Sequence, residues 1–425
     1  MTLPPGRGGW QAGVLAAALL LLTAPAAQSF ESGDKPGGGA LLPDIGGPLE
    51  RVVISVNSAR RSTLRNAELV THLVNGLPQN SQVLILTNDR AAFTTASGHW
   101  PERLSFVELP ADNPITMWTQ DPFLVLGRPD GDAGVTLLKS KTFDRSGDAA
   151  MAGHVARRAG YEVRSSGLYF EGGNVVSDQQ FVLIGANTIR YNALKLELSE
   201  PEVVLRFEAE LGRRVLVVGP FPQPIAHIDM MLTPLGGGRI AVGDSRMGAE
   251  LAEAALRESP AEVEAFEEFC EDQFFGHPSI ASVRGPDGEL ISAPEIRGKT
   301  GEMAEISRSI APVLDGIAGA LAQHGYRVER IPLLYGGPER DREGPGERDF
   351  SAAYPMLTYN NVLITGADVY LPRYGWSRMD RAAADMWSSL GFDPRPIEGL
   401  TISAMYGGAL RCSVKVLERA RPADQ

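Results

Sequence analysis

The chain has 425 residues, of which 43% are hydrophobic and 22% charged, a balance typical of a globular protein with ample apolar material for a core. This length allows two or three domains or one large closed fold. The formal net charge of -12 argues against a nucleic-acid-binding surface and against an anionic membrane as a partner, whereas it suits a cationic substrate.

Residues 1–29 have the pattern of an export signal peptide. Arg7 supplies a positive n-region, Val14–Leu22 is an unbroken apolar core, and Ala24-Pro25-Ala26 matches a small-residue cleavage site. Because this core is too short to span a bilayer, we expect it to be removed and the mature protein to be secreted or periplasmic, without a membrane partner. Residues 30–49 are rich in glycine and are predicted to form a flexible lead-in.

An α/β pattern begins at Arg51. The β-rich runs Arg51–Val56 and Gln82–Leu86 flank a helical stretch, Ser62–Val74, that stops at Gly76. From there a unit recurs, in which a helical segment ends at a glycine and is followed by a short β-rich run, a polar loop and one or two apolar runs. The glycines of the five copies are Gly98, Gly160, Gly212, Gly325 and Gly391, and the polar loops begin at Trp118, Phe170, His227, Tyr359 and Tyr406.

A small helix-on-sheet unit cannot bury its apolar face alone, so five copies in one chain predict a closed ring. The polar loop then occupies the same place in every unit and points at the axis. We therefore expect residues 50–421 to form one domain. A stretch of about 245–308 breaks the spacing, and we expect this insertion, like the charged loop Gly336–Gly346, to be a surface elaboration.

The chain has two cysteines, Cys270 and Cys412. In an oxidising compartment the two could form a disulfide, and composition alone leaves that alternative open. Cys412 follows Gly407-Gly408, a pair that lets the backbone pass close to a bulky group, and precedes an alternating run that predicts a strand. Cys270 lies in an acidic helical stretch and is expected to be structural.

The five polar loops combine a thiol, an imidazole, an amide and several carboxylates: Asp121, Glu171, His227, Asp229, Asn361 and Cys412. A thiolate is a strong nucleophile that needs an acid/base partner, and His227 can serve near neutral pH. Carboxylates raise the pKa of a neighbouring thiol, but they match a planar guanidinium in bidentate geometry. The set predicts substitution at a guanidinium carbon. In His227-Ile228-Asp229, strand alternation puts both polar side chains on one face.

These motifs resemble those of the guanidino-group-modifying (pentein) superfamily, most closely agmatine deiminases and bacterial-type peptidylarginine deiminases. The resemblance covers about residues 50–420 and rests on several motifs in the same order. The motifs are Trp118-Thr119-Gln120-Asp121-Pro122, similar to W/F-x-R-D-x; Phe170-Glu171-Gly172-Gly173-Asn174, similar to E-G-G; His227-Ile228-Asp229, similar to H-x-D; the run Tyr359–Gly375; and the cysteine stretch, similar to G-G-x-x-H-C.

The resemblance implies a five-bladed α/β propeller in which Cys412 attacks the guanidinium carbon and His227 transfers protons. It implies that Asp121 and Asp229 hold the guanidinium nitrogens and that Glu171 supports the histidine. Asn361, Trp118 and Arg411 are candidate substrate-binding residues, with packing as the alternative for Trp118. The resemblance implies no metal or organic cofactor.

Two positions depart from the pattern. Gln120 stands where an arginine is usual, and Arg411 where a histidine is frequent. Export favours peptidyl-arginine as the substrate, because an exported enzyme meets peptides and proteins. Agmatine is the alternative substrate, and a non-catalytic propeller that binds cationic peptides is the alternative from another class.

Overall fold

The computed structural model of the chain describes residues 39–56, 63–97, 102–111, 113, 115–127, 134–275, 296–336, 340–341, 348–349 and 354–420. All of these belong to one compact unit, Asp34–Gln425. The expected signal peptide, the lead-in as far as residue 38 and most of the loop expected at 336–346 lie outside the described residues.

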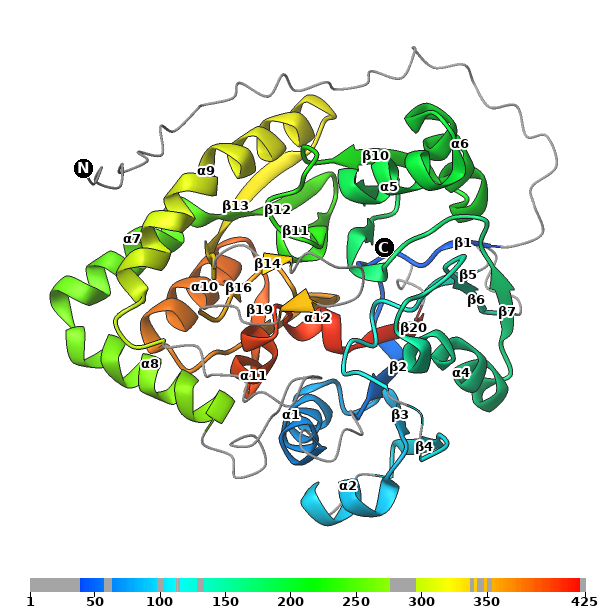
Figure 1. Ribbon diagram of the computed structural model, residues 1–425, viewed down its shortest axis with the longest axis horizontal. Coiled ribbons are helices and arrows are strands. Elements are labelled where there is room, and N and C mark those ends of the chain that lie inside the picture. Colours follow the sequence, from blue (N-terminus) through cyan, green and yellow to red (C-terminus); the bar gives the residue numbers. More distant parts are fainter. Residues whose placement is uncertain are drawn as a thin grey trace, which may run out of the picture. The chain divides into compact units, whose positions relative to one another are not determined.

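Among the described residues, five mixed sheets share one strand pattern (Figure 1). In each sheet the first strand is antiparallel to the second, and the second is parallel to the third. The three strands are, sheet by sheet, β20 (Lys415–Arg419), β2 (Leu49–Ser55) and β3 (Gln82–Thr87); β5 (Phe123–Gly127), β6 (Thr136–Lys139) and β7 (Glu162–Ser165); β8 (Val175–Ser177), β9 (Phe181–Gly185) and β10 (Arg214–Val218); β11 (Leu232–Gly236), β12 (Arg239–Asp244) and β13 (Arg327–Leu334); β17 (Leu363–Thr365), β18 (Asp368–Pro372) and β19 (Asp393–Ile397).

Helices join the parallel strands, because parallel neighbours require a crossover connection. They are α1 (Thr63–Gly76), α2 (Arg90–Ser97), α3 (Ser146–Ala149), α4 (Met151–Ala159), α5 (Ala186–Leu196), α6 (Glu200–Leu211), α7 (Ser245–Glu258), α8 (Pro260–Phe275), α9 (Thr300–Gln323) and α10 (Ser377–Ser389). Gly160 and Gly212 end α4 and α6 with left-handed φ angles of 77° and 67°, as the glycine stops in the sequence predict. A capping box between Ser199 and Glu202 starts α6.

The polar loops lie between sheets, so each copy of the sequence unit straddles two of them. The β-rich run after Gly160 is β7, the last strand of its sheet, and the polar loop beyond it leads into β8 of the next sheet. The fifth copy follows the same rule. Its run Pro394–Ile397 belongs to β19, beside β18, whereas the strand after the cysteine, β20, pairs with β2.

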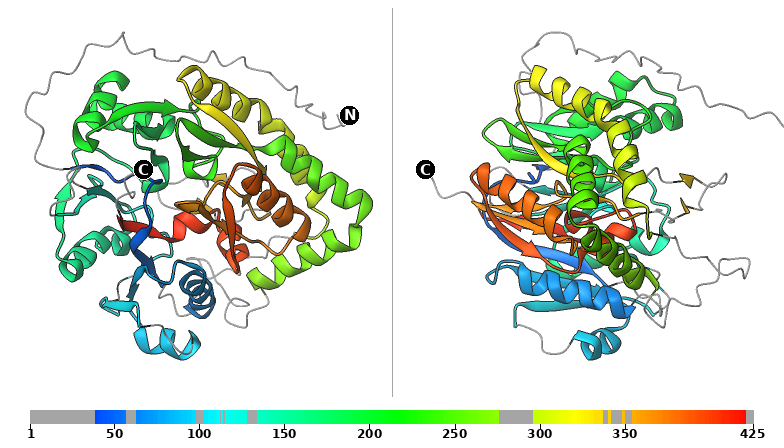
Figure 2. Two further views of the ribbon diagram at one scale, coloured as in Figure 1. Left: turned by 180° about the vertical axis from the view of Figure 1, so that it is seen from behind. Right: turned by 90° about the vertical axis from the view of Figure 1, so that its left-hand side faces the viewer.

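The pairing of β20 with β2 brings the first and last parts of the described chain into one sheet. Val416 lies opposite Val52, and Figures 1 and 2 show the red strand beside the blue one. The sheet is completed by β4 (Leu104–Glu108), parallel to β3. Because Cys412 lies three residues before β20, this closure fixes its position against the first strands of the chain.

The segment 39–49 is part of the fold, so the expected flexible lead-in is wrong for these residues. The short strand β1 (Ala40–Leu41) pairs with the edge of β5, and Leu41 and Ile45 are buried. Burial of these apolar side chains offsets the entropy lost on ordering the segment.

The described helices of the expected insertion are also more than surface elaborations. Ala249, Ala252 and Ala255 of α7 share one buried face, and α7 packs against α9. In α8, Phe266 stacks on Trp376 with ring centroids 4.9 Å apart. Small residues at a spacing of three let two helices approach closely, which explains the buried alanines. Residues 276–295 lie outside the described residues.

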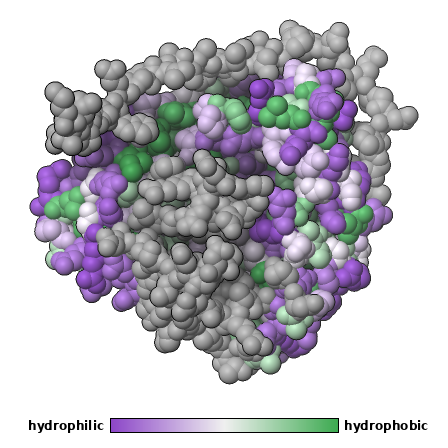
Figure 3. Space-filling view, in the orientation of Figure 1, coloured by the Kyte–Doolittle hydropathy of each residue, from purple (hydrophilic) through white to green (hydrophobic). Residues whose placement is uncertain are grey.

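The remaining described strands are short. β16 (Leu357–Thr358) pairs with the end of β13, and β14 (Arg340–Asp341) pairs with β15 (Arg348–Asp349). Most described residues on the face shown in Figure 3 are hydrophilic, with small apolar patches between them. None of the described helices combines the length and apolarity needed to cross a membrane.

Candidate active site

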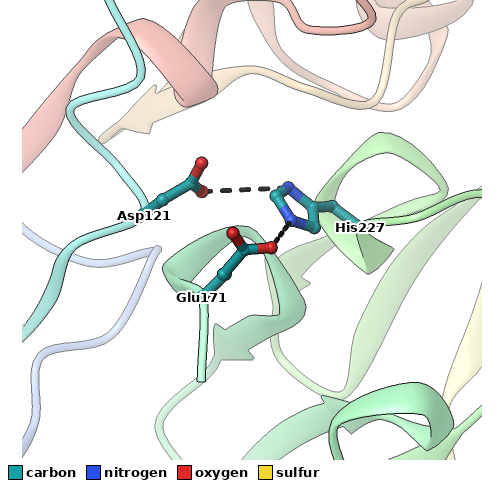
Figure 4. A group of neighbouring side chains, drawn as sticks. All are labelled: Asp121, Glu171 and His227. Atoms are coloured by element: carbon teal, nitrogen blue, oxygen red, sulfur yellow. Dashed lines mark hydrogen bonds and ion pairs between the residues drawn. The ribbon is translucent and has the colours of Figure 1, made fainter. Parts of the chain in front are cut away.

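The loops between sheets bring the predicted site residues together. Asp121 precedes β5, Glu171 precedes the 3-10 turn η1 (Gly172–Asn174), and His227 precedes the 3-10 turn η2 (Ile228–Met230). Figure 4 shows the side chains of Asp121, Glu171 and His227 turned toward one another. The expected strand at His227–Asp229 is a 3-10 turn instead, and Asp229 lies within it.

Two glycines allow these loops to approach. A Cβ on Gly173 would lie 2.3 Å from Nδ1 of His227, and one on Gly172 would lie 2.0 Å from the carbonyl oxygen of Gln120. Atoms this close clash, so any other residue at either position would push the loops apart. Close approach is therefore the physical reason for the Gly172-Gly173 pair, which the sequence indicates only as a loop.

His227 is held by two carboxylates. Its Nε2 lies 2.8 Å from Oε2 of Glu171, and its Nδ1 lies 3.8 Å from Oδ1 of Asp121. Burial alone would lower the pKa of His227, but the charges of Asp121 and Glu171 and the hydrogen bond to Glu171 outweigh it and raise the pKa to about 9. The imidazole is therefore protonated at neutral pH and can donate a proton.

Arg145 was not predicted from the sequence and lies at the centre of this acidic group. Its guanidinium donates to Asp121 over 2.9 Å and to Asp148 over 2.6 Å, and it lies 3.7 Å from Glu171. Burial lowers the pKa of Arg145, but the three carboxylates raise it above its usual value. The spacing of Arg145 and Asp148 by three residues is the only sequence signal for this pair, and it marks a local ion pair rather than a site.

Asp121, Glu171 and His227 also have the geometry of a metal-binding group, with one ligand atom from each within 4.8 Å of the others. Two carboxylates and an imidazole suit a transition metal. The guanidinium of Arg145 is already bonded to Asp121, however, and a metal ion here would have to share this carboxylate with a cation.

Cys412 lies in the one-turn helix α12 (Leu410–Ser413) and is 4% exposed. Its Sγ lies 3.9 Å from Oδ2 of Asp229 and 3.8 Å from the sulfur of Met230. Asn361 joins the two loops, because its side chain accepts from the Cys412 N–H and donates to the Asp229 carbonyl oxygen. The thiol is thus fixed beside the acidic end of η2.

The electrostatic setting of the thiol disfavours its charged form. Burial, followed by the charges of Asp229 and Asp121, raises the pKa of Cys412 well above its ordinary value. Both cysteines are free and buried, so the alternative of a disulfide between Cys270 and Cys412 is wrong. Cys270 lies in the hydrophobic core on α8, as expected for a structural residue.

Arg411 does not have the geometry of a substrate-binding residue. Its guanidinium donates to Oδ1 of Asp44 over 2.8 Å, to Oδ2 of Asp229 over 2.7 Å and to the Val175 carbonyl oxygen. The side chain is buried, because strand closure places it beneath the loops. Arg411 instead positions Asp229, whose other oxygen, Oδ1, has no hydrogen-bond partner among the described residues.

Trp118 and Gln120 hold the loop that carries Asp121. A Cβ on Gly408 would lie 2.2 Å from the Trp118 ring, so Trp118 is the bulky group that the glycine pair before Cys412 accommodates. The Gln120 side chain donates to the Gly172 carbonyl oxygen, and its backbone N–H donates to the Cys412 carbonyl oxygen. Gln120 thus links the three loops, through its neutral side chain and its backbone, where an arginine is usual.

A sequence model of the Porphyromonas-type peptidyl-arginine deiminase family matches residues 55–415, a stretch that contains all of these site residues. The chain belongs to this family. As a member of this family, the protein is a deiminase of guanidino groups, that is, a hydrolase that acts on C–N bonds of linear amidines. No curated protein matches the chain.

The fold of the chain is also similar to those of solved structures. An agmatine deiminase of Enterococcus faecalis is similar with a TM-score of 0.58 and 14% identity, over 93% of this chain and all (100%) of that one. An agmatine deiminase of C. jejuni is similar with a TM-score of 0.56 and 12% identity, over 90% of this chain and 96% of that one. The family member described here thus has the pentein fold, an α/β fold of mixed sheets.

Proposed function

We propose that this protein hydrolyses the guanidinium group of peptidyl-arginine, giving peptidyl-citrulline and ammonia, with Cys412 as the nucleophile. One observation carries the proposal most directly. In the described part of the chain, Oδ1 of buried Asp229 has no hydrogen-bond partner, and the other oxygen of this carboxylate lies 3.9 Å from the Cys412 thiol. A buried carboxylate oxygen without a donor, beside a nucleophile, is suited to a substrate that brings N–H groups and positive charge.

In the proposed mechanism, Asp229 and Asp121 bind the guanidinium nitrogens and place the guanidinium carbon next to Cys412. The thiol gives its proton to solvent water as the cation binds, and the thiolate forms a C–S bond to that carbon, giving a tetrahedral adduct. Protonated His227 donates to the departing nitrogen, so the C–N bond breaks and ammonia leaves. His227 then takes a proton from water, which attacks the thiouronium carbon. Cleavage of the C–S bond releases citrulline and restores the thiol.

The raised pKa of the thiol fits this order of events. In the empty site Asp229 and Asp121 disfavour the thiolate. A bound guanidinium cation neutralises the same carboxylates, so it removes much of this penalty at the moment when the thiolate is needed. Glu171 keeps the imidazole oriented and protonated, and Asn361 holds the Cys412 backbone in place.

We further propose that the five sheets are the blades of a closed propeller around this site. The proposal is supported by the strand pattern that the sheets share and by the pairing of β20 with β2. The polar loops between successive sheets would then all face the axis.

The choice of peptidyl-arginine over agmatine rests on the expected signal peptide, residues 1–29, from which we propose a secreted or periplasmic location. Agmatine is the second candidate substrate, since the solved structures of similar fold include agmatine deiminases. The third candidate is a protein that binds cationic peptides without turnover, and the assay must distinguish it from the two enzymes.

The test is mass spectrometry of an arginine peptide and of agmatine, each incubated with the purified protein. We expect deimination of the peptide, and a loss of at least about 10³-fold in the Cys412→Ala variant. Cys270→Ala is the matched control, because it removes the other buried thiol from the core and should retain activity. If only agmatine is turned over, agmatine and not peptidyl-arginine is the substrate. An unaltered rate in Cys412→Ala would overturn the mechanism.

A further inference from the structure

Behind the catalytic loops lies a small cavity, here called the β20 cavity. Its polar lining consists of Asp44, Gln120, Arg411 and Lys415, and the rest of its wall is apolar and comes from β1, β5, β8, β17 and β20. Its volume is about 30 Å³. A space of this size holds one water-sized particle or one small ion and excludes a nucleotide or a phosphate ester.

Lys415 is the unusual residue of this wall. It is 4% exposed, and in the part of the chain that the structure describes no hydrogen bond or ion pair reaches its ammonium group. Its Nζ lies over the Phe123 ring, 5.4 Å from the ring centroid. A buried ammonium that no hydrogen-bond acceptor contacts is disfavoured unless something compensates for its lost hydration.

The carboxylate beside Lys415 in this wall, Asp44, is shared with other cations. Arg411 is bonded to Asp44 and Asp229, and the carboxylate of Asp229 also acts on His227. Among the described residues, Arg419, four residues beyond Lys415, donates only to the backbone carbonyl oxygens of Gly47, Ile364 and Asp44. The carboxylate of Asp44 therefore acts on three buried cations, Arg411, Lys415 and Arg419.

The pKa values of Lys415 and Arg419 agree with this sharing of one carboxylate. Burial, with a further contribution from Arg411, lowers the pKa of Lys415 to about 7. Burial likewise lowers the pKa of Arg419 to about 10, although Asp44 opposes the shift. Both groups behave as cations whose charge is incompletely compensated.

Hydrogen-bond donors remain available in the same place. A guanidinium has five N–H groups, and the three contacts of Arg411 use three of them. The Gln120 amide uses one of its two N–H groups on Gly172. Lys415 supplies three more donors. We propose that the β20 cavity binds one small monovalent anion, of the class of chloride or formate, between Lys415 and Arg411.

Such an anion would lie directly behind the reacting groups without touching the substrate. Arg411 links it to Asp229, and Gln120 links it to the Cys412 carbonyl oxygen. Binding would neutralise buried charge, so the free energy of unfolding would increase with the logarithm of anion concentration once the site is mostly filled. Because this readout is stability, it is independent of which guanidino compound the enzyme uses.

The test is thermal unfolding of the purified protein in gluconate, replaced stepwise by chloride or formate at constant ionic strength. Gluconate serves as the counter-ion that is too large for the cavity. We expect a rise in melting temperature of about 2 °C or more in the wild type. Lys415→Met keeps the length of the side chain and removes its charge, so it should melt higher in gluconate and lose the rise. Lys195→Met, at an exposed lysine on α5, should keep the rise in melting temperature.

An equal rise in all three proteins would reduce the effect to general salt stabilisation and overturn the proposal, as would no rise in any of them. The rise should also shrink as pH increases through about 7, since Lys415 loses its proton there under the influence of Arg411, Asp44, Asp121 and Asp229. Bromide-soaked wild-type crystals give a check that needs no variant. An anomalous peak between Lys415 and Arg411 supports the site, and its absence overturns it.

Discussion

Single residues in the site mainly balance one another's charge. Arg145 neutralises Asp121 and Asp148, whereas Arg411 neutralises Asp44 and Asp229. The two departures from the family pattern fit this balance. Gln120 orders its loop with neutral hydrogen bonds, and the cation beside the catalytic loops stands at position 411. Oδ1 of Asp229 has no hydrogen-bond partner among the residues that the structure describes, so it is available to a cationic substrate.

Gly173→Ala tests whether the close approach of two loops positions the imidazole. The new methyl group would meet His227 at 2.3 Å, so the ring must move. A displacement of about 1 Å costs about 10²-fold in rate. We expect kcat for the deiminated substrate to fall by this factor. Gly167→Ala is the control, since its nearest neighbour is the flexible end of Glu210 at 3.6 Å. Equal rates in the two variants would contradict the argument.

Arg145→Met tests the charge balance. Asp148 is fully buried and Asp121 is 5% exposed, so removal of their common partner leaves uncompensated carboxylates. We expect the free energy of unfolding in guanidinium chloride to fall by about 3 kcal/mol. Arg90→Met breaks an exposed pair with Glu108 and should cost less than about 1 kcal/mol. If both variants unfold at the same denaturant concentration, Arg145 is not the structural counter-ion of the site.

At the scale of elements, the segment between β1 and β2 locks the last strand into place. Asp44 accepts from Arg411 with one oxygen and from the Ser177 N–H with the other, each over 2.8 Å. Arg419 of β20 donates to the Asp44 and Gly47 carbonyl oxygens. A glycine-rich sequence predicts flexibility here, but tertiary partners supply the order.

Asp44→Ala measures that locking. Loss of the carboxylate leaves the buried Arg411 guanidinium with one ion pair and frees the Ser177 N–H, so we expect unfolding free energy to fall by about 3 kcal/mol. Limited proteolysis should then cut within residues 39–49. Asp315→Ala removes a carboxylate that bridges Arg246 and Arg330 at the surface and serves as the control. A protease pattern identical to that of the wild type would show that the segment is held by its apolar residues alone.

At the scale of the whole molecule, two buried bases act on stability in opposite directions. The pKa of His227 is raised from 6.5 to about 9, so its stabilising contribution is complete below pH 6.5 and is lost as pH rises through about 9. The pKa of Lys415 is lowered from 10.5 to about 7. The free-energy cost of burying the charged Lys415 side chain is therefore complete below pH 7 and disappears as pH approaches 10.5.

Denaturant midpoints measured between pH 6.5 and 9 in a buffer without small anions should separate these contributions. In the His227→Gln variant stability should rise with pH, because the Lys415 contribution remains. In Lys415→Met it should fall with pH, because the His227 contribution remains. The wild type should lie between the two. Parallel pH profiles for the three proteins would contradict the opposed titrations.

The sequence, through its recurring glycine stops and apolar runs, determined the helical crossovers, their glycine ends and the order of the polar loops. These features depend on local conformational preference. It also determined the chemical set, since a thiol, an imidazole and carboxylates at one phase of a repeat point to one reaction. Only the tertiary structure decided that the loops lie between sheets and that β20 pairs with β2. It alone placed Asp44 and Lys415 near the site, because strand closure joins parts of the chain that lie hundreds of residues apart. It alone also brought Arg145 to Asp121 and Glu171, since the loops that carry them meet only in the folded chain.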